Sequence, residues 1–470
     1  MEKFFKYAII FAAIIILAFA VILEIASLSA AEIFNKAMKE QNMLLGTITV
    51  EEIKANIFGE VTFENLLWKD VRGGKILEIP EGGFKVRVFD VLTNNFKSTT
   101  IQELHLNNVG ISVTLDKNMQ VDFIRHSQDF EKVNQEMRHD KNSWEEKVSQ
   151  VNKTEAELKE IGERRRRLQQ SKIEKGWKNF NIENRKLNLA LNLENCHFEV
   201  FYGDRHYLMS GVQLETEVNT DDKMMFRFYT GTFGGTMIGR GMSINGIVDF
   251  HPEVPQCNLL IVLKEIDLAS LGFGLKLHDE MTLSARFTGP ITQPVGKGKI
   301  TMPKLNLPGI NFQNVEGDIH YEDATIDFTD VTAYVYKGKL NANGDYNIDT
   351  RYYNIYAHGD KLKAYAALPK SHLHCDVDLN VNIQSKGNAK ETITSGDFVS
   401  GRGRYSILEF ESLSGKFRSE PNNLNFYDVK INLVSYNLST DALSIVNGKL
   451  HFDPIKIADK DGNIVRVYEQ

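Results

Sequence analysis

Histidine and cysteine side chains come closest together at residues 372–375, which read His-Leu-His-Cys. Nitrogen and sulfur ligands of this kind are those that hold zinc in proteins. The surrounding residues predict a strand, in which His372 and His374 share one face and Cys375 lies on the other. Three ligands would converge only if the strand were broken at this point. We therefore predict no metal site.

Carboxylates that could act as a general acid or base are the next candidates. Glu322 and Glu420 occupy matching positions of an internal repeat, each where a turn is expected, so a turn role is favoured over catalysis. The chain lacks the glycine-rich loops that cradle nucleotide phosphates, the Gly-x-Ser-x-Gly elbow and the His-Glu-x-x-His zinc motif. The sequence predicts no catalytic residue and no cofactor, and we do not expect an enzyme.

Composition narrows the classes of partner. The 470 residues carry a formal net charge of −7, which argues against nucleic acid as the main partner. The three cysteines, Cys196, Cys257 and Cys375, are far apart and form no Cys-x-x-Cys pair. A disulfide framework is therefore not expected.

Strict alternation of apolar and polar residues is the dominant pattern of the chain, and residues 373–384 (Leu-His-Cys-Asp-Val-Asp-Leu-Asn-Val-Asn-Ile-Gln) show it most clearly. This period of two predicts strands with one apolar and one polar face. The apolar face either closes on itself as the core of a β-sandwich or lines an open groove that carries an apolar ligand. The residues that we assign to this face are Leu187, Leu189, Leu191, Leu193, Ile319, Ile326, Phe328, Val377, Leu379, Val381, Ile383, Val429, Ile431 and Leu433.

An internal repeat indicates modules of about a hundred residues. Residues 317–331 (Gly-Asp-Ile-His-Tyr-Glu-Asp-Ala-Thr-Ile-Asp-Phe-Thr-Asp-Val) align without a gap to residues 415–429 (Gly-Lys-Phe-Arg-Ser-Glu-Pro-Asn-Asn-Leu-Asn-Phe-Tyr-Asp-Val). Glycine, glutamate, phenylalanine, aspartate and valine recur in register. Asp330 and Asp428, which precede the recurring valine, are expected to face solvent.

One segment is long and apolar enough to cross a membrane. Residues 7–23 are uninterrupted apolar or aromatic residues, and Lys3 and Lys6 precede them. About twenty such residues span a bilayer, and the basic flank predicts a cytoplasmic N-terminus. We expect an uncleaved anchor that includes Tyr7, Ile14, Leu17 and Leu23. The alternative is a signal peptide cleaved near Ser29, Ala30 and Ala31.

These patterns divide the chain into five parts: a cytoplasmic tail (1–6), a transmembrane helix (7–26), a helix followed by a first β module (27–126), a charged helical insertion (127–178) and a repeated β body (179–470). Turns of the first β module are expected at 72–74, 81–83 and 93–95 because each contains Gly or Asn. The insertion is rich in charge and poor in glycine, which is typical of a solvated helix.

This layout resembles the AsmA-like family of bacterial envelope proteins, which includes the TamB-related proteins. Residues 59–71 (Gly-Glu-Val-Thr-Phe-Glu-Asn-Leu-Leu-Trp-Lys-Asp-Val) look like the opening module of that family. Residues 287–300 (Phe-Thr-Gly-Pro-Ile-Thr-Gln-Pro-Val-Gly-Lys-Gly-Lys-Ile) and 336–344 (Tyr-Lys-Gly-Lys-Leu-Asn-Ala-Asn-Gly) resemble its repeated units. The helical insertion is not part of the family pattern.

The resemblance implies a mostly β fold: a transmembrane helix, then an elongated, curved antiparallel sheet of repeated modules that forms a groove, with a helical insertion. It implies a bridge-like lipid-transfer function, in which phospholipid acyl chains move along the apolar face between the inner and outer membranes of a diderm bacterium. The protein would be a single-pass inner-membrane protein with most of its chain in the periplasm. The alternative is an assembly or scaffold factor that docks an outer-membrane β-barrel protein.

Overall fold

The computed structural model describes residues 46–115 and 155–469, apart from short stretches at 57, 71–72, 94–99, 181–187, 203–204, 220–221, 253, 272–277, 308–309, 370–371, 387–391, 421–422 and 447–448. The described chain is mostly β (73% strand), with a large antiparallel sheet and few helices. No helix within these ranges is long and apolar enough to cross a bilayer. The expected anchor at 7–26 lies outside the described residues.

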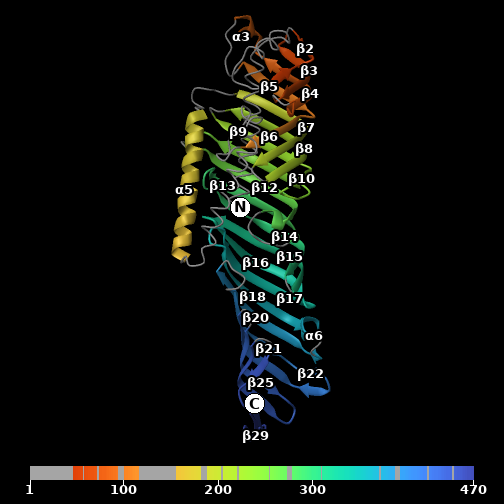
Figure 1. The fold of residues 1–470 in the computed structure, drawn as a ribbon, viewed down its shortest axis with the longest axis vertical. Coiled ribbons are helices and arrows are strands. Elements are labelled where there is room, and N and C mark those ends of the chain that lie inside the picture. The colour runs from red at the N-terminus through yellow and green to blue at the C-terminus, as the bar shows by residue number, and fades with distance from the viewer. Residues whose placement is uncertain are drawn as a thin grey trace. The chain divides into compact units, whose positions relative to one another are not determined.

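The chain divides into two compact units, Met1–Val295 and Gly296–Gln470. Strands of the first unit follow one another across the sheet nearly in chain order (Figure 1). They are β1 (Thr47–Thr49), β2 (Glu52–Ala55), β3 (Glu60–Lys69), β4 (Lys75–Val86), β5 (Ile101–Asn107), β6 (Gly110–Leu115), β7 (Asn188–Tyr202), β8 (Arg205–Asn219), β9 (Lys223–Thr230), β10 (Thr232–Gly235), β11 (Met242–Asp249), β12 (Gln256–Asp267) and β13 (Glu280–Pro290). Its helices are α3 (Val88–Leu92), α5 (Glu155–Phe180) and the 3-10 turn η1 (Leu268–Leu271).

One connection of the first unit differs from all its antiparallel hairpins. Strands β5 and β6 both pair with β7 in parallel, and Leu115 at the end of β6 lies opposite Tyr202 at the end of β7. The chain must therefore travel back along the whole of β7, from beside Tyr202 to Asn188, or ~46 Å. Helix α5, with 26 residues, is ~39 Å long. The helical insertion thus has the length that a parallel crossover needs.

The second unit is an antiparallel meander. Its strands are β14 (Val295–Leu307), β15 (Ile310–Glu322), β16 (Thr325–Val335), β17 (Gly338–Asn347), β18 (Tyr352–Lys363), β20 (Asp376–Lys386), β21 (Ile393–Ser400), β24 (Ser412–Glu420), β25 (Asn423–Asn432), β26 (Asn437–Val446), β27 (Lys449–Phe452), β28 (Ile455–Ala458) and β29 (Ile464–Tyr468). A separate small sheet contains β19 (Leu373–His374), β22 (Gly403–Tyr405) and β23 (Leu408–Phe410), and a short helix, α6 (Ala364–Ala367), follows β18.

The alternating segment at 373–384 is two strands, not one. Leu373 and His374 pair with β22 in the small sheet, whereas β20 pairs with β18 and β21. The change of sheet occurs at Cys375, which is 6% exposed and packs with Ala364 and Phe410 in a small hydrophobic cluster. Cys375 therefore marks the junction between the two sheets.

Bulges with a left-handed residue recur in both units, and they preserve the apolar face. At Asp330 (φ 52°) the register slips between Phe328 and Val331, whose partners Gly344 and Ala342 are only two positions apart. Phe328 and Val331 therefore share a face although three positions separate them. The same apolar-x-polar-apolar pattern, with positive φ at its third residue, occurs at Asn65, Asn108, Asn195, Glu265, Asn314 and Asp428.

This bulge explains the internal repeat. A Cβ atom on Gly317 would lie 2.7 Å from a Val331 methyl carbon. One on Gly415 would lie 2.8 Å from the Phe398 ring and 3.4 Å from a Val429 methyl carbon. The glycine makes room for Val331 in the first repeat and chiefly for the Phe398 ring in the second. The aspartate that precedes each recurring valine takes the left-handed conformation that Asn and Asp tolerate best. Glu322 pairs with Thr325 and Glu420 with Asn423, at the ends of hairpins, so the predicted turn positions are confirmed.

One expected turn is wrong. Residues 81–83 lie inside β4, opposite β3 and β5. A Cβ atom on Gly82 would lie 2.4 Å from the Phe63 ring. Glycine at this position leaves room for the Phe63 ring, and the chain does not turn there.

The length of the crossover allows a test of whether the helical insertion contributes to the stability of the fold. Replacing Ser127–Lys175 by a flexible linker of about ten residues leaves residues 116–126 and 176–187, which can span the ~46 Å return. We expect the thermal midpoint to be nearly unchanged, because longer or shorter loops change stability little and Leu168 of α5 is 59% exposed. Deleting 116–187 entirely cannot bridge that distance and should abolish the fold. A large loss of stability with the linker would show that the insertion packs on the sheet.

Candidate functional site

The apolar face of the first unit is covered. One row runs directly across the sheet, with one residue from each successive strand, and all its members are buried. We call it the N-terminal apolar row: Phe63, Gly82, Leu106, Leu193, Leu214, Phe228, Ile244, Ile261 and Ala285. Burial of each leucine, isoleucine or phenylalanine contributes about 1.5–3 kcal/mol to folding. This row is a hydrophobic core.

The equivalent row of the second unit is only half-buried. We call it the C-terminal apolar row: Val331, Ala342, Ala357, Val381, Gly396, Phe417, Phe426, Leu443 and Phe452. Every member is intermediate in exposure, and beyond Phe410 no described apolar side chain is buried. At ~4.8 Å between strands the row is ~38 Å long. The apolar face is thus partly open here.

The predicted face residues fall into three groups. Leu189, Leu191, Leu193, Ile319 and Ile326 are buried, at 2–8% exposure. Val377, Ile431 and Leu433 pack against the cluster of Ala364, Cys375 and Phe410. The half-buried remainder consists of Phe328, Leu379, Val381, Ile383 and Val429. Leu187 lies outside the described residues, as do Tyr7, Ile14, Leu17 and Leu23.

Aromatic residues of the half-open face are the members that alternation missed. Phe398 and Phe426 pack edge to face with centroids 6.2 Å apart, and Phe417 lies directly opposite Phe426. The bulge at Asp428 shifts β25 by one residue, so its apolar residues do not follow a single period of two. The Phe-x-Asp-Val sequence shared by the two repeats is the signal that could have revealed Phe426.

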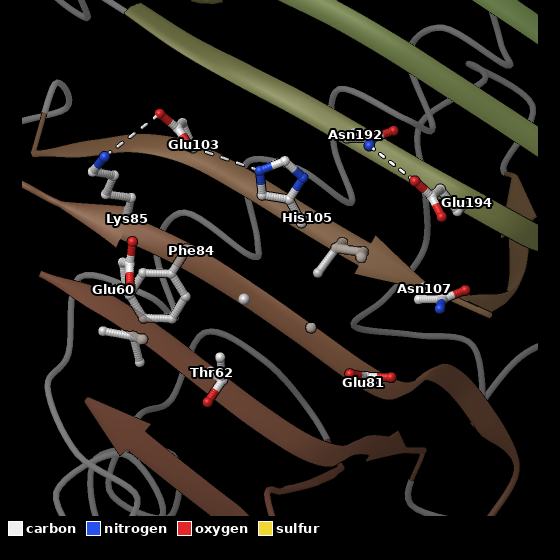
Figure 2. Close-up of a pocket in the computed structure, with 14 residues that line it drawn as sticks. Glu60, Thr62, Glu81, Phe84, Lys85, Glu103, His105, Asn107, Asn192 and Glu194 are labelled. Carbon is white, nitrogen blue, oxygen red and sulfur yellow. Dashed lines mark hydrogen bonds and ion pairs between the residues drawn. The ribbon is translucent and has the colours of Figure 1, made fainter. Parts of the chain in front are cut away.

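A polar hollow lies on the other face of the first unit, over β3, β4, β5 and β7 (Figure 2). Its volume is about 450 Å³. Glu103 lies 4.0 Å from Lys85 and 3.8 Å from His105, and Asn192 donates to Glu194 at 3.1 Å. His105 and Glu194 are exposed and the other three are half-buried. Lys85 and Glu103 pair across β4 and β5, whereas the other two contacts lie within a single strand. Nothing in this arrangement holds an acid and a base against a common substrate position.

The histidine and cysteine candidates lie apart. His374 is exposed and stacks on Tyr365, with ring centroids 5.6 Å apart, whereas Cys375 is buried. Among the described residues, no group of three or more His, Cys, Asp or Glu side chains is placed to hold a metal ion. Burial raises the pKa of the Cys196 and Cys257 thiols to about 11, and it also raises the pKa of Cys375. All three remain protonated at neutral pH, which disfavours a nucleophilic or ligand role.

The two apolar rows should respond differently to a charge. Leu191→Asp places a carboxylate at a position that is 4% exposed, a cost of several kcal/mol, and we expect the thermal midpoint to fall by about 10 °C or more. Leu379→Asp lies on the half-open face and should leave the protein folded. Gln384→Glu, exposed on the opposite face of β20, is the control. Thermal unfolding followed by circular dichroism measures the stability of the three variants. An equal loss of stability in both aspartate variants would show that the two faces are equally closed.

Comparison of the chain with protein-family models, with curated proteins and with solved structures finds no match. The AsmA-like resemblance therefore rests on the sequence layout and the motifs at 59–71, 287–300 and 336–344.

Proposed function

We propose that the protein binds phospholipid acyl chains on the half-open apolar face of its second unit and carries them between the inner and outer membranes of a diderm bacterium. The single observation that carries the proposal is the C-terminal apolar row, which crosses nine strands in eight successive pairing steps, from β16 to β27, with every member at intermediate exposure. Leaving such a surface half in water costs free energy that a bound apolar ligand recovers.

The dimensions of the row fit this ligand. An acyl chain spans half of a hydrocarbon core about 30 Å thick, and the row is ~38 Å long. An acyl chain that leaves a bilayer for water loses about 0.8 kcal/mol for each CH₂ group. A continuous apolar surface removes most of that barrier, so the transfer requires neither catalysis nor a cofactor.

The AsmA-like resemblance supports the place of transfer. In that arrangement the segment at 7–26 anchors the chain in the inner membrane, and the β body forms an elongated, curved groove in the periplasm. The residues that we propose to contact lipid are those of the C-terminal apolar row, together with Leu379, Ile383 and Phe398. Leu189, Leu191 and Leu193 are buried and serve the core in this proposal.

A scaffold function is the second candidate, and the last strand favours it. All residues of β29 (Ile464–Tyr468) are exposed, and its pairing in the described chain is with β28. An exposed edge strand of this kind is a template for β-augmentation by another sheet. The partner in this case would be an outer-membrane β-barrel protein.

Lipid content tests the proposal. We expect the purified full-length chain to carry phospholipid detectable by native mass spectrometry or solvent extraction. Val381→Asp should reduce the phospholipid per chain at least several-fold, because a carboxylate then lies among the acyl chains.

Gln384→Glu, on the opposite face of the same strand, should keep its lipid. Equal phospholipid in the Val381→Asp and Gln384→Glu variants would contradict lipid binding on this face. A stoichiometric protein partner without lipid, lost when 464–470 is removed, would support the scaffold function instead.

A further inference from the structure

The polar face of the second unit holds a hollow of its own, formed by β17, β18, β20 and β21, with a volume of about 370 Å³. The strand register sets Asn343, Tyr356, Asn382 and Ser395 side by side across these strands. Their side chains alternate along each strand with members of the C-terminal apolar row. The hollow is therefore on the face opposite the proposed lipid surface.

A hydrogen-bonded relay fixes one wall of this hollow. Nδ1 of His358 donates to Oδ1 of Asn380 at 2.8 Å, and Nδ2 of Asn380 donates to Asp397 at 2.9 Å. The amide is thereby held in one orientation and the imidazole in one tautomer. Such pre-oriented polar groups reduce the entropy that a ligand loses on binding.

Two further amides have capacity for a ligand. Oδ1 of Asn343 accepts from the backbone N–H of the bulge residue Asp330 at 2.9 Å, which directs its amino group as a donor. Oδ1 of Asn382 is buried and has no hydrogen-bond partner among the described residues. A buried amide oxygen without a donor is costly. Asn382 lines the hollow and is half-buried as a residue, so a rotation of its amide into the hollow would let a ligand hydroxyl donate to this oxygen and remove that cost.

Tyr356 lies between these two amides in the register and is 54% exposed. An exposed aromatic ring offers an apolar surface beside polar groups that both donate and accept. Neither lysine nor arginine lines the hollow, so an anionic ligand finds no counter-charge there. Apolar C–H faces bordered by hydroxyl groups are the chemistry of a sugar ring.

We propose that this hollow binds a neutral saccharide, with a sugar ring on Tyr356 and its hydroxyl groups on Asn343 and Asn382. The proposal does not rest on lipid transfer, because the two surfaces lie on opposite faces of the sheet. It gives the second unit a separate site for a carbohydrate.

Saturation-transfer NMR on the full-length chain tests the site. The probes are maltotriose and triacetylchitotriose, and the detergent is lauryldimethylamine oxide, which has no sugar head group to compete. We expect saturation transfer from the protein to at least one of the two trisaccharides. Tyr356→Ala should weaken its binding about threefold to tenfold, and Asn382→Ala should weaken it by a similar factor, whereas Tyr356→Phe should retain most of it.

Tyr334→Ala is the matched control, because Tyr334 is 48% exposed on β16 and does not line the hollow. The Tyr334→Ala variant should bind the trisaccharide with the same affinity as the unsubstituted chain. Absence of transfer to both trisaccharides, or equal affinity in Tyr356→Ala and Tyr334→Ala variants that are both folded, overturns the proposal.

Discussion

The register of the strand ladder is the constraint on which this structure depends. A slip of one residue moves every side chain of a strand to the other face, so a sheet with one apolar face works only if all its strands stay in phase. The bulges at Asn195, Glu265, Asp330 and Asp428 maintain this phase where the apolar residues are three positions apart. In each bulge the residue of positive φ has an apolar residue two positions before it and another directly after it.

Because the phase is kept, both units present apolar rows that cross strand after strand, and the two rows differ in how far their side chains are buried. The N-terminal apolar row is buried throughout and supplies cohesion, as Phe228 at 1% exposure and Ile261 at 2% illustrate. The C-terminal apolar row is half-buried from Val331 to Phe452. The same pattern thus serves as a core in one unit and, in our proposal, as a lipid-binding surface in the other. The polar face provides hydrogen-bonding groups such as the His358–Asn380–Asp397 relay.

Sequence reasoning predicted the strands and their apolar residues well where alternation is regular, as in 189–193 and 377–383, because a period of two follows directly from strand geometry. It did not anticipate that Leu191 is buried and Leu379 half-open, since both have the same local pattern and burial is decided by distant residues. It read Gly82 as a turn, whereas the Phe63 ring occupies the space beside it. Asp330 and Asp428 are exposed, as expected, but the bulges at these residues were missed, although the shared Phe-x-Asp-Val sequence marks them.

Photo-crosslinking tests the central claim, that acyl chains lie on the half-open face, most directly. A benzoylphenylalanine placed at Phe417, in the middle of the C-terminal apolar row, is a conservative aromatic change. The account predicts that irradiation in cells of a diderm bacterium yields a phospholipid adduct at this position. The same group at Arg418, exposed on the opposite face, should yield none. The absence of a lipid adduct at position 417, or an equal yield at position 418, would contradict the account.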